Sequence, residues 1–253
     1  MQQYFIDQTI KVQDEVLFNK EQAHHISHVM RMKENDVIRI ADYKGHMFFA
    51  HLLFKNGDVS CIIDEEIQDC TKNLVSITLA QGLIKKEKWD FLLQKCGELG
   101  VDEIVPFTSS RTVVKTKDEK QDKKLQRWNK ILLEACEQCK RSTLVNLHEP
   151  VPFSKLVKKS EDYDVKLIAY ENAEVKSFHI KDVLKSYPNA KKVFVCVGCE
   201  GGFSEEEVVE LEQHGFQRIS LGGRILRAET AAMVVTHAIS FYYEMLGDYN
   251  ETH

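Results

Sequence analysis

Residues 193–207 read VFVCVGCEGGFSEEE and carry the most informative structural pattern in the sequence. It opens with a continuous apolar run, which is typical of a strand buried on both faces. The run ends in a glycine-rich turn, and a helix is predicted to follow, with Ser204 as N-cap and Glu207 completing a capping box. Ligands of open α/β sheets bind at the carboxyl ends of the strands, where this turn is expected to lie.

The charges in this stretch narrow the choice of ligand. Glycines let the backbone approach a ligand closely. Three glutamates, residues 205–207, crowd the first helical turn, and Glu200 is nearby, so the positive helix end already has its counter-charges. These carboxylates would repel a pyrophosphate, and the G-x-G-x-x-G pattern is absent. A neutral nucleoside or a sulfonium cation fits better, although a plain strand–turn–helix joint has the same local pattern.

A second glycine loop lies in residues 221–232, which read LGGRILRAETAA. A strand is predicted to end at Leu221 and a helix to begin near Ala228. Arginine on a glycine loop is suited to gripping a phosphate or a developing negative oxygen. Arg224 and Arg227 are therefore candidates for that role, and surface arginines beside a capped helix are the alternative interpretation.

Around these two loops, strands and helices alternate over residues 73–253. Such alternation predicts an α/β domain with a mostly parallel sheet. The predicted strands are residues 74–81, 103–107, 144–147, 165–170, 192–197 and 216–221, and the predicted helices are residues 87–98, 120–140, 204–214 and 228–246.

Residues 1–72 are predicted to form a separate, β-rich domain. Short runs at 36–41, 47–54 and 59–63 have strand composition, and Asn56-Gly57 is a hairpin signal. Several short strands at close spacing favour a small barrel. One helix is predicted to interrupt the strands, at residues 21–33.

Composition limits the class of protein. The chain has 253 residues, no apolar run long enough for a membrane span and no signal-peptide pattern, so we expect a cytoplasmic protein. Seven cysteines, an odd number, favour reduced thiols. The pairs Cys136/Cys139 and Cys196/Cys199 are too far apart for a zinc ribbon. His24 and His28 lack a third ligand in the sequence, so we expect no metal.

The overall charge hides a local asymmetry. The net charge is −5, which is not typical of a nucleic-acid-binding protein. Residues 111–141 nevertheless hold ten basic and five acidic side chains. Such a concentration can neutralise phosphates, although a solvated helix face is the simpler interpretation of any single lysine.

The two glycine loops together resemble the bacterial 16S rRNA uracil N3-methyltransferases of the SPOUT superfamily. The similar pattern is G-x-EGGFS from Gly198 followed by LG-x-RILR-x-ETA from Leu221. Residues 24–36, 94–101 and 134–138 also resemble this family, so the similarity extends over nearly the whole chain. The family usually has proline where this chain has Cys199, which argues against an essential nucleophilic thiol there.

This resemblance implies an α/β methyltransferase domain of the SPOUT type over residues 73–253, with a deep trefoil knot, preceded by a PUA-like RNA-binding barrel over residues 1–72. It further implies S-adenosylmethionine as cofactor, 16S rRNA within the small ribosomal subunit as partner, and a homodimer. The cofactor residues it implies are Gly198, Glu200, Gly202, Leu221, Gly222, Ile225 and Leu226, with Tyr170 and Glu171 as weaker candidates. The RNA contacts are Arg31, Lys33, Arg111 and Arg141.

The chemistry of uracil suggests catalytic roles. N3 becomes nucleophilic only when its proton leaves, and the resulting charge spreads onto O2 and O4. Arg227 or Arg224 is expected to stabilise that charge, and Glu229 is a candidate base. Two alternatives remain: a related methyltransferase acting on another nucleoside or a ribose 2′-hydroxyl, and a non-catalytic RNA-binding assembly factor. A dinucleotide-dependent oxidoreductase is disfavoured by the acidic helix start.

Overall fold

The computed structural model describes residues 1–113, 121–170 and 178–246. The chain divides into two compact units. The first comprises Met1–Lys72 and Leu133–Leu144, and the second comprises Asn73–Leu132 and Val145–His253. Within the described ranges, no helix combines the length and apolar character that crossing a membrane requires.

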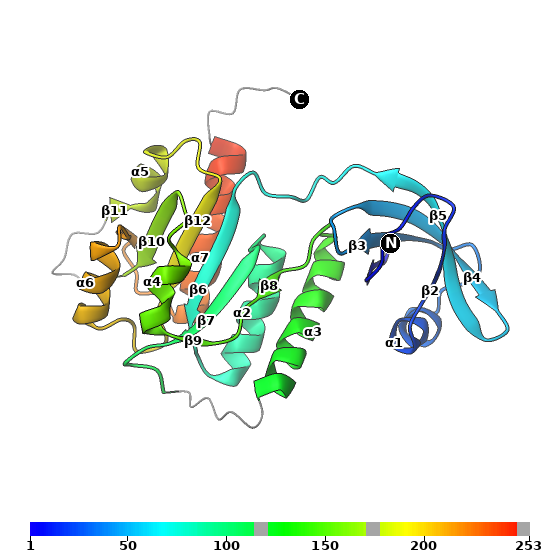
Figure 1. The fold of residues 1–253 in the computed structure, drawn as a ribbon, viewed down its shortest axis with the longest axis horizontal. Coiled ribbons are helices and arrows are strands. Elements are labelled where there is room, and N and C mark those ends of the chain that lie inside the picture. The colour runs from blue at the N-terminus through cyan, green and yellow to red at the C-terminus, as the bar shows by residue number, and fades with distance from the viewer. Residues whose placement is uncertain (114–120, 171–177, 247–253) are drawn as a thin grey trace. The chain divides into compact units, whose positions relative to one another are not determined.

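The first unit is built on a five-stranded sheet with the order β1-β3-β4-β5-β2 (Figure 1). Its pairs are antiparallel except β1 with β3. Asn56 and Gly57 join β4 to β5 with φ angles of 52° and 91°, which confirms the predicted hairpin. The strands are β1 (Gln3–Ile6), β2 (Glu15–Leu17), β3 (Val37–Asp42), β4 (Met47–Lys55) and β5 (Asp58–Ile67).

The first unit contains a shorter helical segment than the one predicted at residues 21–33. The observed α1 (Lys20–His24) runs into a single π-helical turn, η1 (His25–Val29), and helical structure ends there. Arg31 and Asn35 take φ angles of 53° and 65°, which no right-handed helix accommodates. The Lys33 amide instead donates to the Asp36 carboxylate at 2.8 Å, a local turn that competes with the helix.

A distant piece of chain completes the first unit. Residues 133–144 belong to it, although they follow 60 residues of the second unit. The Phe5 amide donates to the Glu137 carboxylate at 3.2 Å, and the Gln3 side chain donates to the Arg141 carbonyl at 2.6 Å. The helix α3 (Gln121–Cys139) therefore starts in one unit and ends in the other.

The second unit contains an eight-stranded sheet with the order β11-β13-β10-β12-β6-β7-β8, and β9 also pairs with β7. Its pairings are parallel throughout, as predicted. The strands β9 and β11 have two residues each and were not predicted, because so short a pairing leaves no periodic signal. The strands are β6 (Ser76–Gly82), β7 (Glu103–Thr108), β8 (Asn146–Leu147), β9 (Val151–Pro152), β10 (Val165–Ala169), β11 (Phe178–His179), β12 (Lys192–Val197) and β13 (Gln217–Ser220).

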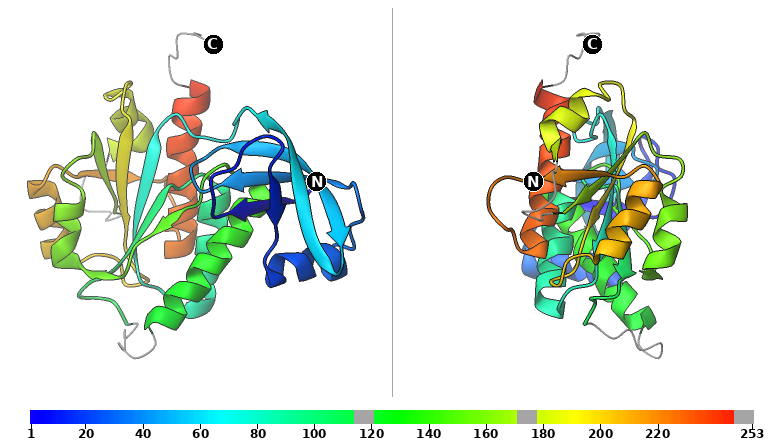
Figure 2. Two further views of the ribbon diagram at one scale, coloured as in Figure 1. Left: turned by 45° about the vertical axis from the view of Figure 1, so that its right-hand side comes forward. Right: turned by 90° about the vertical axis from the view of Figure 1, so that its left-hand side faces the viewer.

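Helices cover both faces of this sheet. In the right-hand view of Figure 2, α7 (red) and α6 (orange) lie on opposite sides of it. Besides α3, the helical segments of this unit are α2 (Lys86–Glu98), the 3₁₀ turn η3 (Phe153–Lys155), α4 (Leu156–Lys159), α5 (Ile180–Lys185), α6 (Glu205–Gln213), α7 (Ala228–Phe241) and the π turn η4 (Tyr242–Leu246).

The C-terminal helix is also shorter than predicted. The expected helix over residues 228–246 is α-helical only to Phe241 and continues as the wider turn η4. Tyr243 in this turn is fully buried, and its hydroxyl donates to the Tyr187 carbonyl at 2.9 Å. The buried tyrosine and its hydrogen bond anchor the end of the helix.

Candidate active site

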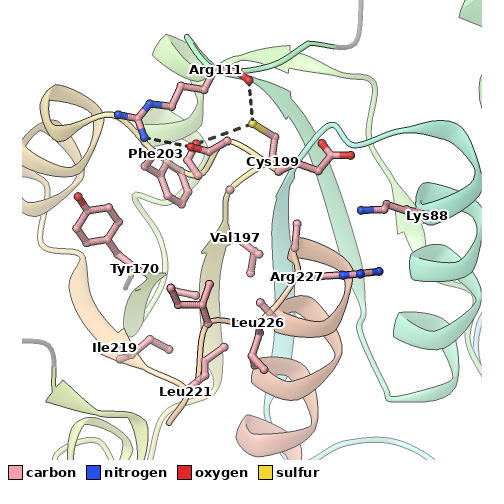
Figure 3. A pocket seen from close by; sticks show the side chains of 18 of the residues that line it. Lys88, Arg111, Tyr170, Val197, Cys199, Phe203, Ile219, Leu221, Leu226 and Arg227 are labelled. Carbon is pink, nitrogen blue, oxygen red and sulfur yellow. Dashed lines mark hydrogen bonds between the residues drawn. The ribbon is translucent and has the colours of Figure 1, made fainter. Parts of the chain in front are cut away.

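A cavity of about 640 Å³ opens at the carboxyl edge of the parallel sheet (Figure 3). The ends of β10, β12 and β13 and the start of α7 border it. Lys88 on α2 and Arg111 after β7 contribute side chains from two further elements. The cavity is therefore at the sheet edge where the sequence predicts a ligand.

The loop after β12, residues 198–204, is held by close backbone packing. A Cβ on Gly198 would lie 3.0 Å from Gly202 backbone atoms, and one on Gly82 would lie 2.5 Å from the Cys199 nitrogen. At Gly82 only glycine permits so close a contact with backbone, and Gly198 packs nearly as tightly. The buried Gln81 side chain donates to the Gly198 carbonyl at 3.0 Å, which ties β6 to the loop.

The backbone and side chains of residues 109–111 support the same loop from its other side. Arg111 donates from Nη1 to the Gly201 carbonyl at 3.1 Å. The Cys199 thiol donates to the Arg111 carbonyl, with sulfur and oxygen 3.3 Å apart (Figure 3). The Cys199 thiol thus fixes the loop by a hydrogen bond, at the position where the family resemblance leads us to expect the rigid ring of proline.

Glu207 links this support to the helix that follows the loop. Ser204 and Glu207 form the predicted capping box, with the Ser204 hydroxyl accepting from the Glu207 amide at 3.2 Å. The buried Glu207 carboxylate also accepts from the Ser110 amide at 2.8 Å. Hydrogen bonds from the Glu206 amide and the Ser204 hydroxyl lower the pKa of the exposed Glu206 carboxyl, so negative charge is stabilised at this helix start.

The loop after β13, residues 221–227, is far more open to solvent. Gly222 takes a φ angle of 115°, and its amide donates to the Ser220 hydroxyl at 3.2 Å. Ile225 is 88% exposed, and the side chains of Arg224 and Arg227 are exposed as well. Arg227 is the N-cap residue of α7 and makes no side-chain capping bond, and its side chain extends from the start of α7 toward α2, on the side where Lys88 lies (Figure 3).

The first turn of α7 contains a buried carboxylate, that of Glu229. Glu229 is 8% exposed, and its Oε1 lies 3.6 Å from the Lys88 ammonium. Its Oε2 is buried and has no hydrogen-bond partner among the described residues. Lys88 lines the cavity and Glu229 does not, so the lysine is the member of this ion pair that borders the cavity.

The structure brings most of the predicted cofactor residues together. Tyr170 also lines the cavity, whereas Glu171 lies outside the described residues. Gly222, Arg224 and Glu229 do not line it. The predicted site residues that do are Gly198, Glu200, Gly202, Leu221, Ile225, Leu226 and Arg227.

The predicted RNA contacts have different surroundings. Arg111 lines the cavity of the second unit. Arg31 and Lys33 lie in the first unit, where both side chains are exposed. Arg141 belongs to that unit too but is only 7% exposed, which leaves little of its side chain for an RNA contact in this conformation.

Lys88 is a charged cavity residue that was not among the predicted site residues. In the sequence it is one of three neighbouring lysines with Lys85 and Lys86, a pattern equally typical of a solvated helix face. Only the packing of α2 against α7 turns it toward Glu229 and the cavity. No local signal could have selected it from the other two lysines.

With this geometry established, known proteins identify the family. The family model described as RNA methyltransferase domain matches residues 71–240. The chain belongs to the RNA methyltransferase family. A second model, RNA methyltransferase PUA domain, matches residues 18–59 of this methyltransferase.

Individual relatives agree with that assignment. The methyltransferase is 34% identical to ribosomal RNA small subunit methyltransferase E of Bacillus subtilis, over 97% of this chain and 98% of the relative. It matches the crystal structure of ribosomal RNA small subunit methyltransferase E from Neisseria gonorrhoeae bound to S-adenosyl methionine with a TM-score of 0.87, at 29% identity over 96% and 98% of the two chains. A methyltransferase from Legionella pneumophila in complex with SAM gives 0.83, at 30% identity over 94% and 96%.

The cavity of this methyltransferase fits a nucleoside sulfonium. Its volume lies within the range of small-molecule sites. The packed glycine loop presents backbone groups, and apolar side chains such as Val197 and Leu226 line the cavity. Glu200 and Glu205 add carboxylates, which favour a cation over a phosphate. Among the described residues, no group of three histidine, cysteine or acidic side chains is arranged to hold a metal.

Proposed function

We propose that this protein transfers a methyl group from S-adenosylmethionine to N3 of a uridine in 16S rRNA. The observation that carries the proposal is the composition of one cavity. A glycine-lined, partly acidic side suits the cofactor, and two cations, Lys88 and Arg227, suit a base that becomes an anion. The relatives named for small-subunit ribosomal RNA support the substrate class.

Seven residues would hold the cofactor, which supplies an electrophilic methyl group when bound. The loop after β12 offers backbone groups at Gly198 and Gly202 and the carboxylate of Glu200, whose Oε1 also accepts from the Lys85 amide at 3.1 Å. The loop after β13 would close over the cofactor with Leu221, Gly222, Ile225 and Leu226. The exposure of Ile225 leaves that loop free to adjust.

The remaining site residues would act on uracil. Arg227 reaches the cavity and would donate to a uracil oxygen as negative charge develops there. Arg224, in the exposed part of the same loop, would contact the RNA near the target base. Glu229 is the candidate base by sequence, but acting directly would require its buried carboxylate to become accessible.

We also propose the SPOUT knot for the second unit and a closed PUA-like barrel for the first. The chain leaves β13, passes through residues 221–227 and enters α7, which packs on β6 and β12. The chain therefore crosses strands that precede it in sequence, as it does in a knotted fold, although knots are rare. Arg31 and Lys33 would contact rRNA, with Arg111 and Arg141 as further candidates. The enzyme would work as a cytoplasmic homodimer.

A labelling experiment tests the proposed function. The protein is incubated with small ribosomal subunits that lack their native base methylations and with S-adenosylmethionine radiolabelled in the methyl group. The RNA is then digested and the labelled nucleoside identified. Label in 3-methyluridine is the expected result.

Other outcomes separate the alternatives. Label in another base or on a ribose would keep the cofactor and the reaction class but replace the target. Absence of label together with cofactor binding in a titration would point to a different RNA substrate. Absence of both label and binding would favour a non-catalytic assembly factor.

A further inference from the structure

Lys88 differs from the other charged side chains that line the cavity. It comes from α2, whereas Glu200, Glu205 and Arg227 come from the two loops and the start of α6. Arg111 follows β7 and is bound to the Gly201 carbonyl. Lys88 is bound to a buried carboxylate, and its side chain is 34% exposed. The Lys88 ammonium is paired with Glu229, and the partly exposed side chain lines the cavity, so it is suited to contact an anion bound there.

Glu229 is placed to hold that ammonium. Its side chain is 11% exposed, and burying an ionised carboxylate without a partner is costly. The Lys88 ammonium, 3.6 Å from Oε1, compensates that charge, as does the start of α7. In this arrangement Glu229 contacts the lysine, and the lysine side chain extends from α2 toward the cavity that it lines (Figure 3).

We infer that Lys88 is a catalytic residue, positioned by Glu229, whose ammonium stabilises negative charge on a uracil oxygen together with Arg227. This inference rests on the proposed function. The N3–H bond breaks and its proton passes to solvent water, while the electron pair spreads over N3, O4 and O2. Lys88 keeps its proton and donates a hydrogen bond to the oxygen. N3 then attacks the methyl carbon, and the carbon–sulfur bond breaks with its electron pair remaining on sulfur.

The test uses the full chain, unmethylated small subunits and S-adenosylmethionine, with kcat for 3-methyluridine formation measured from pH 6.5 to 9. Lys88→Met keeps the alkyl stem and removes the charge, and Lys88→Arg restores the charge. At pH 6.5, Lys88→Met is expected to lower kcat about 100-fold, the usual cost of one lost donor to a developing oxyanion, and Lys88→Arg to recover about a tenth or more of wild-type kcat. The affinity for the cofactor should stay within about twofold of wild type, because Lys88 is proposed to act on uracil in the transition state. A loss of ground-state binding would instead raise KM and leave kcat unchanged.

The pH profile separates catalysis from structure. As pH rises, more uracil loses its N3 proton without help, so the deficit of Lys88→Met should narrow. A merely structural lysine would lower kcat by the same factor at every pH, and that result would overturn the inference. Lys86→Met, on the exposed side of the same helix, is the matched control and should leave kcat unchanged.

Glu229→Gln distinguishes a positioning residue from a base. If the carboxylate only positions Lys88, this variant should lose less activity than Lys88→Met, about 10-fold, because the amide keeps an oxygen beside the ammonium and removes only the charge. A larger loss in Glu229→Gln than in Lys88→Met would overturn the inference and make Glu229 the acting group. Wild-type enzyme that forms no 3-methyluridine would instead refute the proposed function itself.

Discussion

The loops after β12 and β13 both line the cavity, but they are held very differently. Residues 198–204 are tied down by Gln81, by Arg111 and by the capping box of α6. Within the part of the chain that the structure describes, residues 221–227 have little support beyond the turn at Gly222, and Ile225 is almost fully exposed. The difference predicts that residues 198–204 form a fixed loop and that residues 221–227 form an open loop, which adjusts when cofactor and RNA bind.

The largest expected effect comes from filling the space under the fixed loop. In Gly82→Ala the new Cβ would lie 2.5 Å from the Cys199 nitrogen, so the backbone must shift. We expect a loss of about 3 kcal/mol in the free energy of unfolding, typical of severe overpacking, together with loss of cofactor binding. Urea unfolding and a cofactor titration measure the two effects.

The matched substitution in the open loop is Gly223→Ala. No atom of residues 1–113, 121–170 or 178–246 lies within 4 Å of a Cβ placed there. We expect a change below about 0.5 kcal/mol in the free energy of unfolding, as for an ordinary surface position. Equal destabilisation by the two alanines would abolish the distinction between a fixed and an open loop.

Catalysis gives the second prediction. Arg227→Ala should lower kcat about 100-fold, or roughly 2.7 kcal/mol in transition-state stabilisation, because a donor to a developing negative oxygen is lost. Cofactor affinity should change little. Single-turnover methylation and a cofactor titration test this. Comparable losses in turnover and in cofactor affinity would mean that Arg227 only shapes the loop.

The third prediction concerns the carboxylate that joins the fixed loop to residues 109–111. Glu207→Gln places an amide NH₂ where one of the Ser110 and Ser204 amides now donates. We expect a loss of about 1–2 kcal/mol in the free energy of unfolding, the cost of an unmatched buried donor. Glu210→Gln, on the exposed face of α6, should be neutral in the same unfolding experiment.

The smallest effect is expected at Arg111. Removing its hydrogen bond to the Gly201 carbonyl should weaken cofactor binding about fivefold, corresponding to about 1 kcal/mol. Lysine cannot reproduce the guanidinium geometry, so Arg111→Lys should weaken cofactor binding as much as Arg111→Ala. The opposite outcome would be unchanged cofactor binding in both variants, with RNA affinity lost in Arg111→Ala and restored in Arg111→Lys. That outcome would assign Arg111 to the RNA.

The features that could be predicted from the sequence are those specified by residues close to one another along the chain. The apolar strand, the glycine turn and the Ser204–Glu207 capping box lie within 15 consecutive residues, and the structure confirms each of them. The Asn56-Gly57 hairpin was predictable for the same reason. Because parallel strands share one carboxyl edge, the position of the cavity followed from those local signals.

The missed features depend on contacts between distant segments. Gly82 must be glycine because the Cys199 backbone packs on it, 117 positions away in sequence. Lys88 becomes a site residue through Glu229, on another helix. The helix end after Val29 was missed because the left-handed turn at Arg31 has no glycine to signal it. Distant packing and unusual backbone angles at ordinary residues leave no mark in local sequence patterns.

The helix α3 has a consequence for the order in which the chain is made. The ribosome completes residues 1–72 first, but Gln3 and Phe5 bond to residues 133–144. More than half of the polypeptide must therefore emerge before the N-terminal unit receives its last segment. During translation, the partners of these groups arrive late, and the N-terminal unit can be completed only after residues 73–132 of the second unit have been made.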